Sequence, residues 1–509
     1  MARPKHRLRP LAALAAATLA GASLSIAWIT GADAAEDELP ELGSPANAAI
    51  SLEDEYGAGL MIMRTLREGG QVLEDPEVNE YMQDVGHRLS SRAEEGQHQF
   101  TYFVVRDAAI NAFALPGGFI AVNSGLLTST SNENELAGVL AHETAHVTQR
   151  HIARAIIDQS HSGLVSTAAM LAAILLGATA GRGSSGSGME GAILATQGAA
   201  MQHQINYTRS QEFEADRIGI YTMASAGFDP LGMPAFFETL NRNSAEPSRT
   251  KAVEFLIDHP VTSDRIAESR NRAEQIGRIR HEDSLSYGLM RERVRALVGD
   301  PRLSVNYYED LRKNGGGRGL DERYGRAIAY IMAKNAGPAI AELQALLREY
   351  PKITQLYAAL GQAYLLDNQF KESQAVLEKA LGLFPRNIPV TIRLAETCMR
   401  AGDNKRAHLL LLDLFDVVAP TPDQARLIAK AANAAGDVAD SYYYMSEFYI
   451  MNGELAKSLT QLQLALTLPG LNPIQRARMS ARLEEVRTAL ARESKKQRVA
   501  GDNGGAGRL

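Results

Sequence analysis

The amino-acid sequence predicts an α+β domain, built of helices and a small mixed sheet, followed by an all-α solenoid of paired helices. Three observations support this fold class. Short β-rich runs lie between residues 100 and 122, an amphipathic helical stretch follows at residues 132–157, and from about residue 320 helices recur with a period of 34 residues. With 509 residues, 45% of them hydrophobic, the chain can fill the cores of two or more domains.

The predicted domain boundaries follow these changes of pattern. We expect an export signal at 1–34, the α+β domain at 45–285, a linker helix and loop at 286–319, the repeat domain at 320–470, and a C-terminal helix with a disordered tail at 471–509. The disorder is expected after about Arg492, where the sequence becomes charged and rich in glycine.

The first 34 residues have the pattern of a cleaved export signal. Basic residues precede an apolar run from Leu11 to Ile29, and Ala32-Asp33-Ala34 provides a cleavage site of the small-x-small type. We therefore expect cleavage near Ala34 and a soluble mature protein in the periplasm. The apolar run is long, so retention as an N-terminal anchor is the alternative.

Composition limits the possible partners. The net charge is only −6, and acidic and basic residues are mixed along the chain, so no surface for polyanions is expected and nucleic acid is not a predicted partner. Cys398 is the single cysteine, so an exported chain of this sequence has no internal disulfide and depends on packing.

The α+β domain is predicted to contain one small sheet among several helices. Strands are predicted at Phe100–Val105, Asn111–Leu115 and Phe119–Val122. Helices are predicted at 51–68, 76–94, 132–157, 210–226 and 262–280. Pro116-Gly117-Gly118 joins the second and third strands as a hairpin turn, and Asn132 is the expected N-cap of the central helix.

An apolar run from Leu164 to Leu176 precedes a segment at 177–191 that is rich in glycine and serine. The run is too short to span a bilayer. One prediction is a buried helix followed by a flexible loop. The other is a mobile lid, or a flap that makes peripheral contact with a membrane.

The region after residue 320 repeats at a spacing of 34 residues. Small residues recur at Ala327, Gly361 and Ala395, and leucines recur at Leu343, Leu377 and Leu411. Small residues let paired helices approach closely, while the leucines fill the space between them. These are tetratricopeptide-type repeats, which leave a concave surface for peptides or protein partners.

The stretch His142-Glu143-Thr144-Ala145-His146 lies inside the predicted central helix. Residues four positions apart share a helix face, so His142 and His146 can each direct one ring nitrogen at a tetrahedral Zn²⁺ ion. Glu143 lies beside them, placed to take a proton from water as the catalytic base. The pattern predicts one zinc ion per chain and hydrolysis of peptide bonds.

The third zinc ligand is predicted farther along the chain. His151 is one position away from where a three-histidine site requires its third ligand, so we expect it at the surface or behind a ligand. Glu212 and Asp216 share one face of the helix predicted at 210–226, whereas Glu214 points elsewhere. We predict Glu212 as the ligand and Asp216 as a catalytic-site residue that orients a zinc-bound histidine.

These motifs, together with Asn111-Ala112-Phe113-Ala114-Leu115-Pro116-Gly117-Gly118 and the run Glu212-Phe213-Glu214-Ala215-Asp216, resemble the gluzincins, a zincin-like metalloprotease family that includes the HtpX, Oma and CAAX-prenyl proteases. The resemblance spans roughly residues 51–469. With the export signal and the repeats, it implies a protease that degrades unfolded or stalled outer-membrane proteins, assists their assembly, and meets the β-barrel assembly machinery through the repeat domain.

The resemblance also suggests roles for the hairpin and for a downstream histidine. By analogy with thermolysin-like folds, Asn111, Ala112 and Phe113 are expected to bind substrate from an edge strand, to which an extended peptide adds as one more strand. His259 lies in a segment that resembles one near the metal in this family. It is a candidate fourth ligand and latch, and a structural loop histidine is the alternative.

Two other functions are compatible with the sequence. One is a repeat-based chaperone or assembly adaptor with little proteolytic role. The other is a general periplasmic peptidase without preference for membrane-barrel substrates.

Overall fold

The computed structural model describes residues 50–93, 99–158, 208–244, 255–256 and 259–505. The expected export signal and the apolar run with its glycine-rich continuation at 164–191 lie outside these residues. Within the described ranges, no helix combines the length and the apolar character that a bilayer crossing requires.

Within the described residues, the sheet has three strands in the order β1-β3-β2. Its strands are β1 (Thr101–Val105), β2 (Ala112–Leu115) and β3 (Phe119–Asn123). The central strand β3 runs parallel to β1 and antiparallel to β2. The sheet is therefore small and mixed, as predicted, and β2 lies at its edge.

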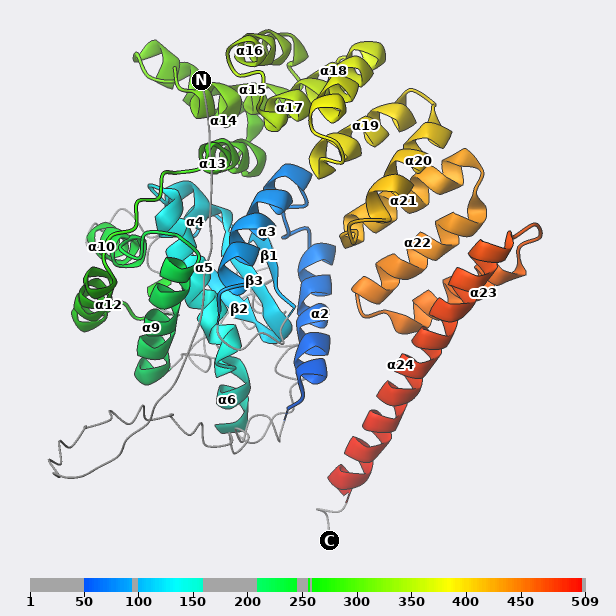
Figure 1. Ribbon diagram of the computed structural model, residues 1–509, viewed down its shortest axis with the longest axis horizontal. Coiled ribbons are helices and arrows are strands. Elements are labelled where there is room, and N and C mark those ends of the chain that lie inside the picture. The colour runs from blue at the N-terminus through cyan, green and yellow to red at the C-terminus, as the bar shows by residue number, and fades with distance from the viewer. Residues whose placement is uncertain (1–49, 94–98, 159–207, 245–254, 257–258, 506–509) are drawn as a thin grey trace, which may run out of the picture. The chain divides into compact units, whose positions relative to one another are not determined.

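Alternate residues of the sheet face two different layers, as the two-residue period of a strand requires. Phe103, Leu115, Phe119 and Ala121 belong to a hydrophobic cluster with α2 (Leu52–Glu68). The opposite face, including Tyr102, Val104, Ala112, Ala114, Ile120 and Val122, belongs to the cluster that contains residues of α3 (Pro76–Ser90) and α5 (Glu133–Thr148). Figure 1 shows α2 and α3 beside the sheet.

A single 3-10 turn, η1 (Pro116–Gly118), connects β2 to β3 and requires glycine. Gly117 and Gly118 have φ values of 77° and 90°. A Cβ atom on Gly117 would lie 2.4 Å from Cα of Tyr56 in α2, and one on Gly118 would lie 2.2 Å from the carbonyl oxygen of Gln99. The turn is thus both left-handed and in close contact with its neighbours.

The helix predicted at 132–157 is two helices, so that prediction is wrong in its length. Asn132 caps α5 as expected, accepting the Glu135 N–H at 3.0 Å. The helix ends at Thr148, Arg150 adopts φ 51°, and α6 (His151–Asp158) begins directly after it. Arg150 Nε donates to Glu55 of α2 at 2.9 Å, so a distant helix stabilises this break.

Among the described residues, this part of the chain also contains α9 (Arg209–Ser225), α10 (Gly232–Ser244) and α12 (Ser263–Ile276). Both α9 and α10 contact α5, and α12 contacts α9. Thr208 forms a capping box with Gln211 at the start of α9. Gly277, at φ 93°, ends α12 short of the predicted end near residue 280.

The segment at 286–319, expected to be a linker helix and loop, forms two packed helices, α13 (Leu285–Val298) and α14 (Pro301–Lys313). Asp300 and Pro301 start α14, since aspartate caps a helix and proline suits its first turn. α13 contacts α3, the short helix α4 (Ser124–Ser129) and the first repeat helix. One hydrophobic cluster accordingly continues from Leu73 to Ala363.

The repeats form helices that pack against their neighbours in the chain, in keeping with the predicted helix pairs. They comprise α15 (Leu320–Met332), α16 (Ala336–Glu349), α17 (Thr354–Leu366), α18 (Phe370–Leu383), α19 (Ile388–Arg400), α20 (Asn404–Phe415), α21 (Pro422–Ala435), α22 (Val438–Met451) and α23 (Leu455–Thr467). A Cβ atom on Gly361 would lie 2.6 Å from Cγ of Leu377, which explains the small residue at this repeating position.

The last helix, α24 (Pro473–Gly505), extends beyond Arg492, where a disordered tail was expected. The residues that follow Arg492 include glutamate, lysine, glutamine and arginine, which favour helix more strongly than the glycines near the end oppose it. The prediction gave too much weight to charge.

Candidate active site

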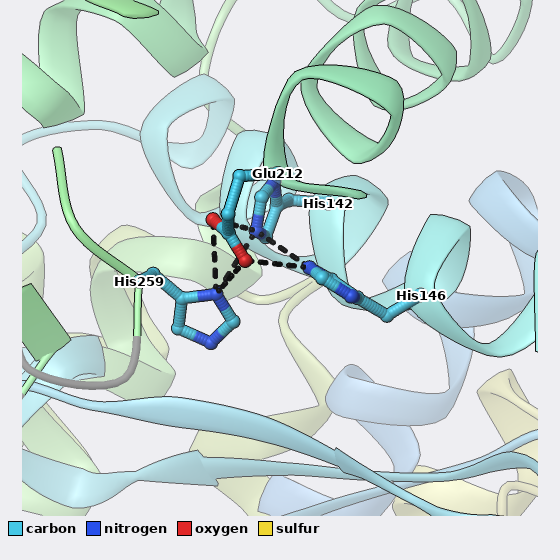
Figure 2. A group of neighbouring side chains, drawn as sticks. All are labelled: His142, His146, Glu212 and His259. Carbon is cyan, nitrogen blue, oxygen red and sulfur yellow. Dashed lines mark hydrogen bonds and ion pairs between the residues drawn. The ribbon is translucent and has the colours of Figure 1, made fainter. Parts of the chain in front are cut away.

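Four buried side chains from three parts of the chain converge on one point (Figure 2). His142 and His146 come from α5, Glu212 from α9, and His259 from the segment before α12. The Nε2 atoms of His142 and His146 are 3.1 Å apart and lie 3.5 and 3.4 Å from the Glu212 carboxylate. Nδ1 of His259 lies 3.1 Å from the same carboxylate. The four candidate ligand atoms lie within 4.8 Å of one another.

The contact made by Nδ1 of His142 indicates how Nε2 of the same ring can interact with the cluster. This Nδ1 lies 3.0 Å from Asp216 Oδ1, and because a carboxylate only accepts hydrogen bonds, this ion pair favours a proton on Nδ1. Nε2 is then the ring atom that can exchange its proton for a bound cation and offer it a lone pair. Facing lone pairs repel one another unless a cation lies between them. Imidazole nitrogens with one carboxylate oxygen are a donor set suited to a divalent metal such as zinc.

The electric field at this point also favours a cation. Burial alone would lower the pKa of His142, but its hydrogen bonds to Asp216 and Glu212 raise it to about 10. Burial alone would raise the pKa of Glu212, but His259 and the hydrogen bonds from the other two histidines hold it well below its usual value. Positive charge on His142 is therefore stabilised, whereas burial holds the pKa of His146 well below its usual value.

Arg265 supports the carboxylates from behind, a contact that the sequence reasoning missed. Its guanidinium donates to Asp216 through Nε and Nη2, each at 2.7 Å, and pairs with Glu212 at 2.6 Å. The side chain is only 1% exposed. The signal that could have indicated it is its place six residues after His259, in the segment that resembled the family.

Glu143 lies beside the cluster with both carboxylate oxygens buried and without a hydrogen bond. Burial raises its pKa, against the opposing effects of His259 and His142. The backbone N–H of Ala114 in β2 is near enough to lower this pKa, although it forms no full hydrogen bond. A buried carboxylate with a raised pKa next to an edge strand is suited to proton transfer.

His151 is buried, so its expected position at the surface is wrong, and it lies behind His146, a candidate ligand. Its Nδ1 lies 2.9 Å from Nδ1 of His146. Its Nε2 lies 3.1 Å from Glu214, which points away from the ligand cluster as predicted.

The three residues predicted to bind substrate lie at the edge of the sheet. Ala112 and Phe113 belong to β2, and Asn111 precedes it. Asn111 is buried, and its side-chain oxygen accepts the Ala112 N–H at 2.9 Å, so part of its role is to shape the start of the strand. Substrate contact through these residues stays a prediction.

A second group with possible metal ligands, His408, Asp437 and Asp440, lies in the repeats. Arg478 already forms an ion pair with Asp440, and the amide of Gln475 donates to both aspartates. The negative charge of this second group is thus largely compensated. The cluster of His142, His146, Glu212 and His259 is therefore the better metal site.

Comparison with known proteins agrees with this geometry. Residues 76–273 match peptidase family M48, and residues 364–431 match a tetratricopeptide repeat family. The beta-barrel assembly-enhancing protease of Yersinia pestis is 30% identical over 91% of this chain and 94% of its own length. The Escherichia coli K12 protein of that name is 31% identical over 89% and 91%. The mitochondrial metalloendopeptidase OMA1 of Schizosaccharomyces pombe is 37% identical over 32% of this chain and 43% of its own.

Proposed function

Since this chain belongs to peptidase family M48 and is a metalloprotease related to beta-barrel assembly-enhancing proteases, we propose that it is a zinc-dependent endopeptidase that degrades misfolded or stalled outer-membrane proteins in the periplasm and assists their assembly. One observation carries the enzymatic part of the proposal. His142, His146 and Glu212 converge beside the buried carboxylate of Glu143, next to the edge of the sheet.

In this proposal His142, His146 and Glu212 hold the zinc ion, and Asp216 fixes the ring of His142. When bound, zinc supplies Lewis acidity that polarises the scissile carbonyl and makes water more acidic. Glu143 accepts the proton from water as it attacks, then gives the proton to the leaving amine. The raised pKa of its buried carboxyl group suits both steps.

The edge strand β2 is the proposed platform for substrate. One side of β2 pairs with β3, and its other side is not paired with any strand among the described residues. An extended peptide that adds to this side brings its main chain past the Ala114 N–H and toward Glu143. Such binding selects unfolded segments over folded ones, because only an extended chain can pair in this way.

His259 has a second role in the proposal, as a fourth ligand that keeps the enzyme latent. Its Nδ1 faces Glu212 at 3.1 Å, and its Nε2 lies 3.4 Å from Glu143. In this position it occupies the space that water and a substrate carbonyl need. Movement of the segment before α12 would open the site.

The substrate class rests on the names of the relatives and on the repeats. Unfolded or stalled outer-membrane proteins and the β-barrel assembly machinery are the proposed partners, the latter through the repeat helices. The export signal expected at residues 1–34 supports the periplasm as the location.

The decisive experiment is to capture substrates in cells with Glu143→Gln, which keeps the ligands but removes the base. Outer-membrane proteins retained by this variant, and cleaved by the parent, are the expected result. Cleavage by purified Glu143→Gln would contradict the role of Glu143, and a bound set without membrane-barrel proteins would favour a general peptidase.

The latch is tested separately with His259→Ala. We expect faster cleavage of an unfolded substrate and weaker zinc binding than in the parent. If neither changes, His259 is a structural loop residue.

A further inference from the structure

The break between α5 and α6 brings His151 back to a metal-ligand candidate. In a continuous helix, residue 151 would be rotated about 140° from residue 146 around the axis and would point away from it. Because Arg150 adopts φ 51°, His151 instead contacts His146, with 2.9 Å between the two Nδ1 atoms. Both rings are fully buried.

The hydrogen-bond directions in this contact are set by chemistry. If His146 presents the lone pair of Nε2 to the cluster, its proton is on Nδ1, and Nδ1 must donate to Nδ1 of His151. His151 then carries its own proton on Nε2, which lies 3.1 Å from Glu214 Oε2. Glu214 can only accept, so it determines the proton position on each ring in turn.

A basic residue contacts Glu214, the last residue in this series of hydrogen bonds. Arg154 of α6 lies 3.4 Å from Glu214 Oε2. The break itself is stabilised by α2, since Arg150 donates to the Ile50 carbonyl at 2.6 Å and to Glu55. The path from Glu214 to His146 is therefore held at both ends by neighbouring helices.

We propose that His151 and Glu214 are positioning residues that hold His146 with Nε2 toward the metal, as Asp216 does for His142. The inference rests on the proposed zinc site and extends it, because it assigns a role to a glutamate that faces away from the ligands. A hydrogen-bonded partner on the outer nitrogen fixes the tautomer and the ring orientation of a ligating histidine.

The test measures the zinc dissociation constant of the whole chain by competition with a chromophoric chelator. His151→Leu fills the space without an acceptor, and His151→Asn keeps an acceptor near the position of Nδ1. We expect His151→Leu to weaken zinc binding by about 10- to 100-fold and His151→Asn to weaken it much less. Arg209→Ala, an exposed change on α9, the helix that carries Glu214, is the control and leaves binding unchanged.

A spectroscopic measurement separates positioning from packing. In the zinc-loaded parent, nitrogen-15 NMR should detect a slowly exchanging Nδ1 proton on His146, and His151→Leu should lose it. A folded His151→Leu variant with the zinc affinity and the Nδ1 signal of the parent overturns the inference.

If His151→Leu does not fold, Glu214→Ala decides, because its side chain is 30% exposed and its loss is tolerated more easily. We expect a few-fold weaker zinc affinity, and parent-like affinity and Nδ1 exchange would overturn the assignment. A parent chain that binds no zinc overturns the proposed function, which separates that failure from a failure of this inference.

Discussion

Arg265 holds Asp216 through two parallel hydrogen bonds of 2.7 Å, in an environment almost closed to water. A planar guanidinium matched to a carboxylate in this way fixes both position and orientation. Because Asp216 also contacts Nδ1 of His142, the pair links α12 to the candidate metal site through α9.

Replacing Arg265 by methionine should destabilise the metal-free protein by about 3–5 kcal/mol, because the Asp216 and Glu212 carboxylates lose a buried cation. Zinc should recover part of this loss by supplying positive charge. Urea unfolding with and without zinc measures both effects. Arg209→Ala, which breaks an exposed pair with Asp264, should cost less than about 1 kcal/mol. A similar loss in both variants would show that burial of the charges is unimportant.

Removal of metal should lower the melting temperature of the parent. At a free zinc concentration of 100 times the dissociation constant, binding adds about 2.7 kcal/mol to the free energy of unfolding. Differential scanning calorimetry before and after chelation measures the shift. His146→Ala should retain little of it, since one candidate ligand is lost. A chelator-insensitive parent would contradict the metal site.

Arg293→Met should destabilise the protein by about 3–5 kcal/mol, since Asp75 and Glu77 at the start of α3 would be left with Arg393 alone. Urea unfolding measures the loss. The control Arg386→Ala breaks an exposed pair with Asp413 and should cost less than about 1 kcal/mol.

The ion pairs of Asp75 with Arg293 and Arg393 should also make the free energy of unfolding depend on pH. Burial alone would raise the pKa of Asp75, but Arg293 and Arg393 hold it well below its usual value. A depressed pKa contributes stability that is present above the ordinary value near 4 and is lost as pH falls toward the folded-state value. Arg293→Met should therefore flatten the decline of stability below pH 4. If the variant loses stability below pH 4 as steeply as the parent, other carboxyl groups cause the decline.

Glu80→Gln should stabilise the protein at neutral pH. Burial on α3, with Asp84 and Glu77 nearby, raises the pKa of Glu80 from 4.5 to about 7. The folded state holds this proton more tightly than the unfolded state, so the parent loses stability as pH rises from 4.5 to 7. The variant should gain about 1–2 kcal/mol above pH 7 and nothing below pH 4.5, after a discount for partial exposure. Chemical unfolding across this range, with Glu53→Gln as control, measures the difference.

Two glycines in the repeats should respond oppositely to alanine. Gly361→Ala places a Cβ atom 2.6 Å from Leu377 and should destabilise by about 1–3 kcal/mol. Gly382 in α18 has no atom within 4 Å of an added Cβ, so Gly382→Ala should stabilise by about 0.5–1 kcal/mol through helix propensity. Thermal unfolding compares the two. Equal effects would contradict close helix approach at Gly361.

Sequence reasoning succeeded where the information was local. His142 and His146 share a face because of their spacing, and Glu212 and Asp216 do so for the same reason, so their grouping follows from helix geometry. The edge position of β2 followed from analogy, and the sheet order confirms it.

What it missed depends on contacts between distant segments. Arg150 is not a glycine, so the sequence around it did not indicate the left-handed turn that ends α5. Its partner Glu55, which stabilises the turn, lies 95 residues away. The contact of His151 with His146 follows from that turn. Arg265 was overlooked because its two partners belong to another helix.

The continuous core from Leu73 to Ala363 limits how this protein can be dissected. A truncation after residue 285 would remove Tyr287 and Met290 and expose the core residues that pack with them. An isolated repeat fragment would likewise expose its own part of this core. Fragments of this kind would bind hydrophobic surfaces without specificity. Partner binding is therefore better assigned by point substitution in the intact chain than by cutting it into parts.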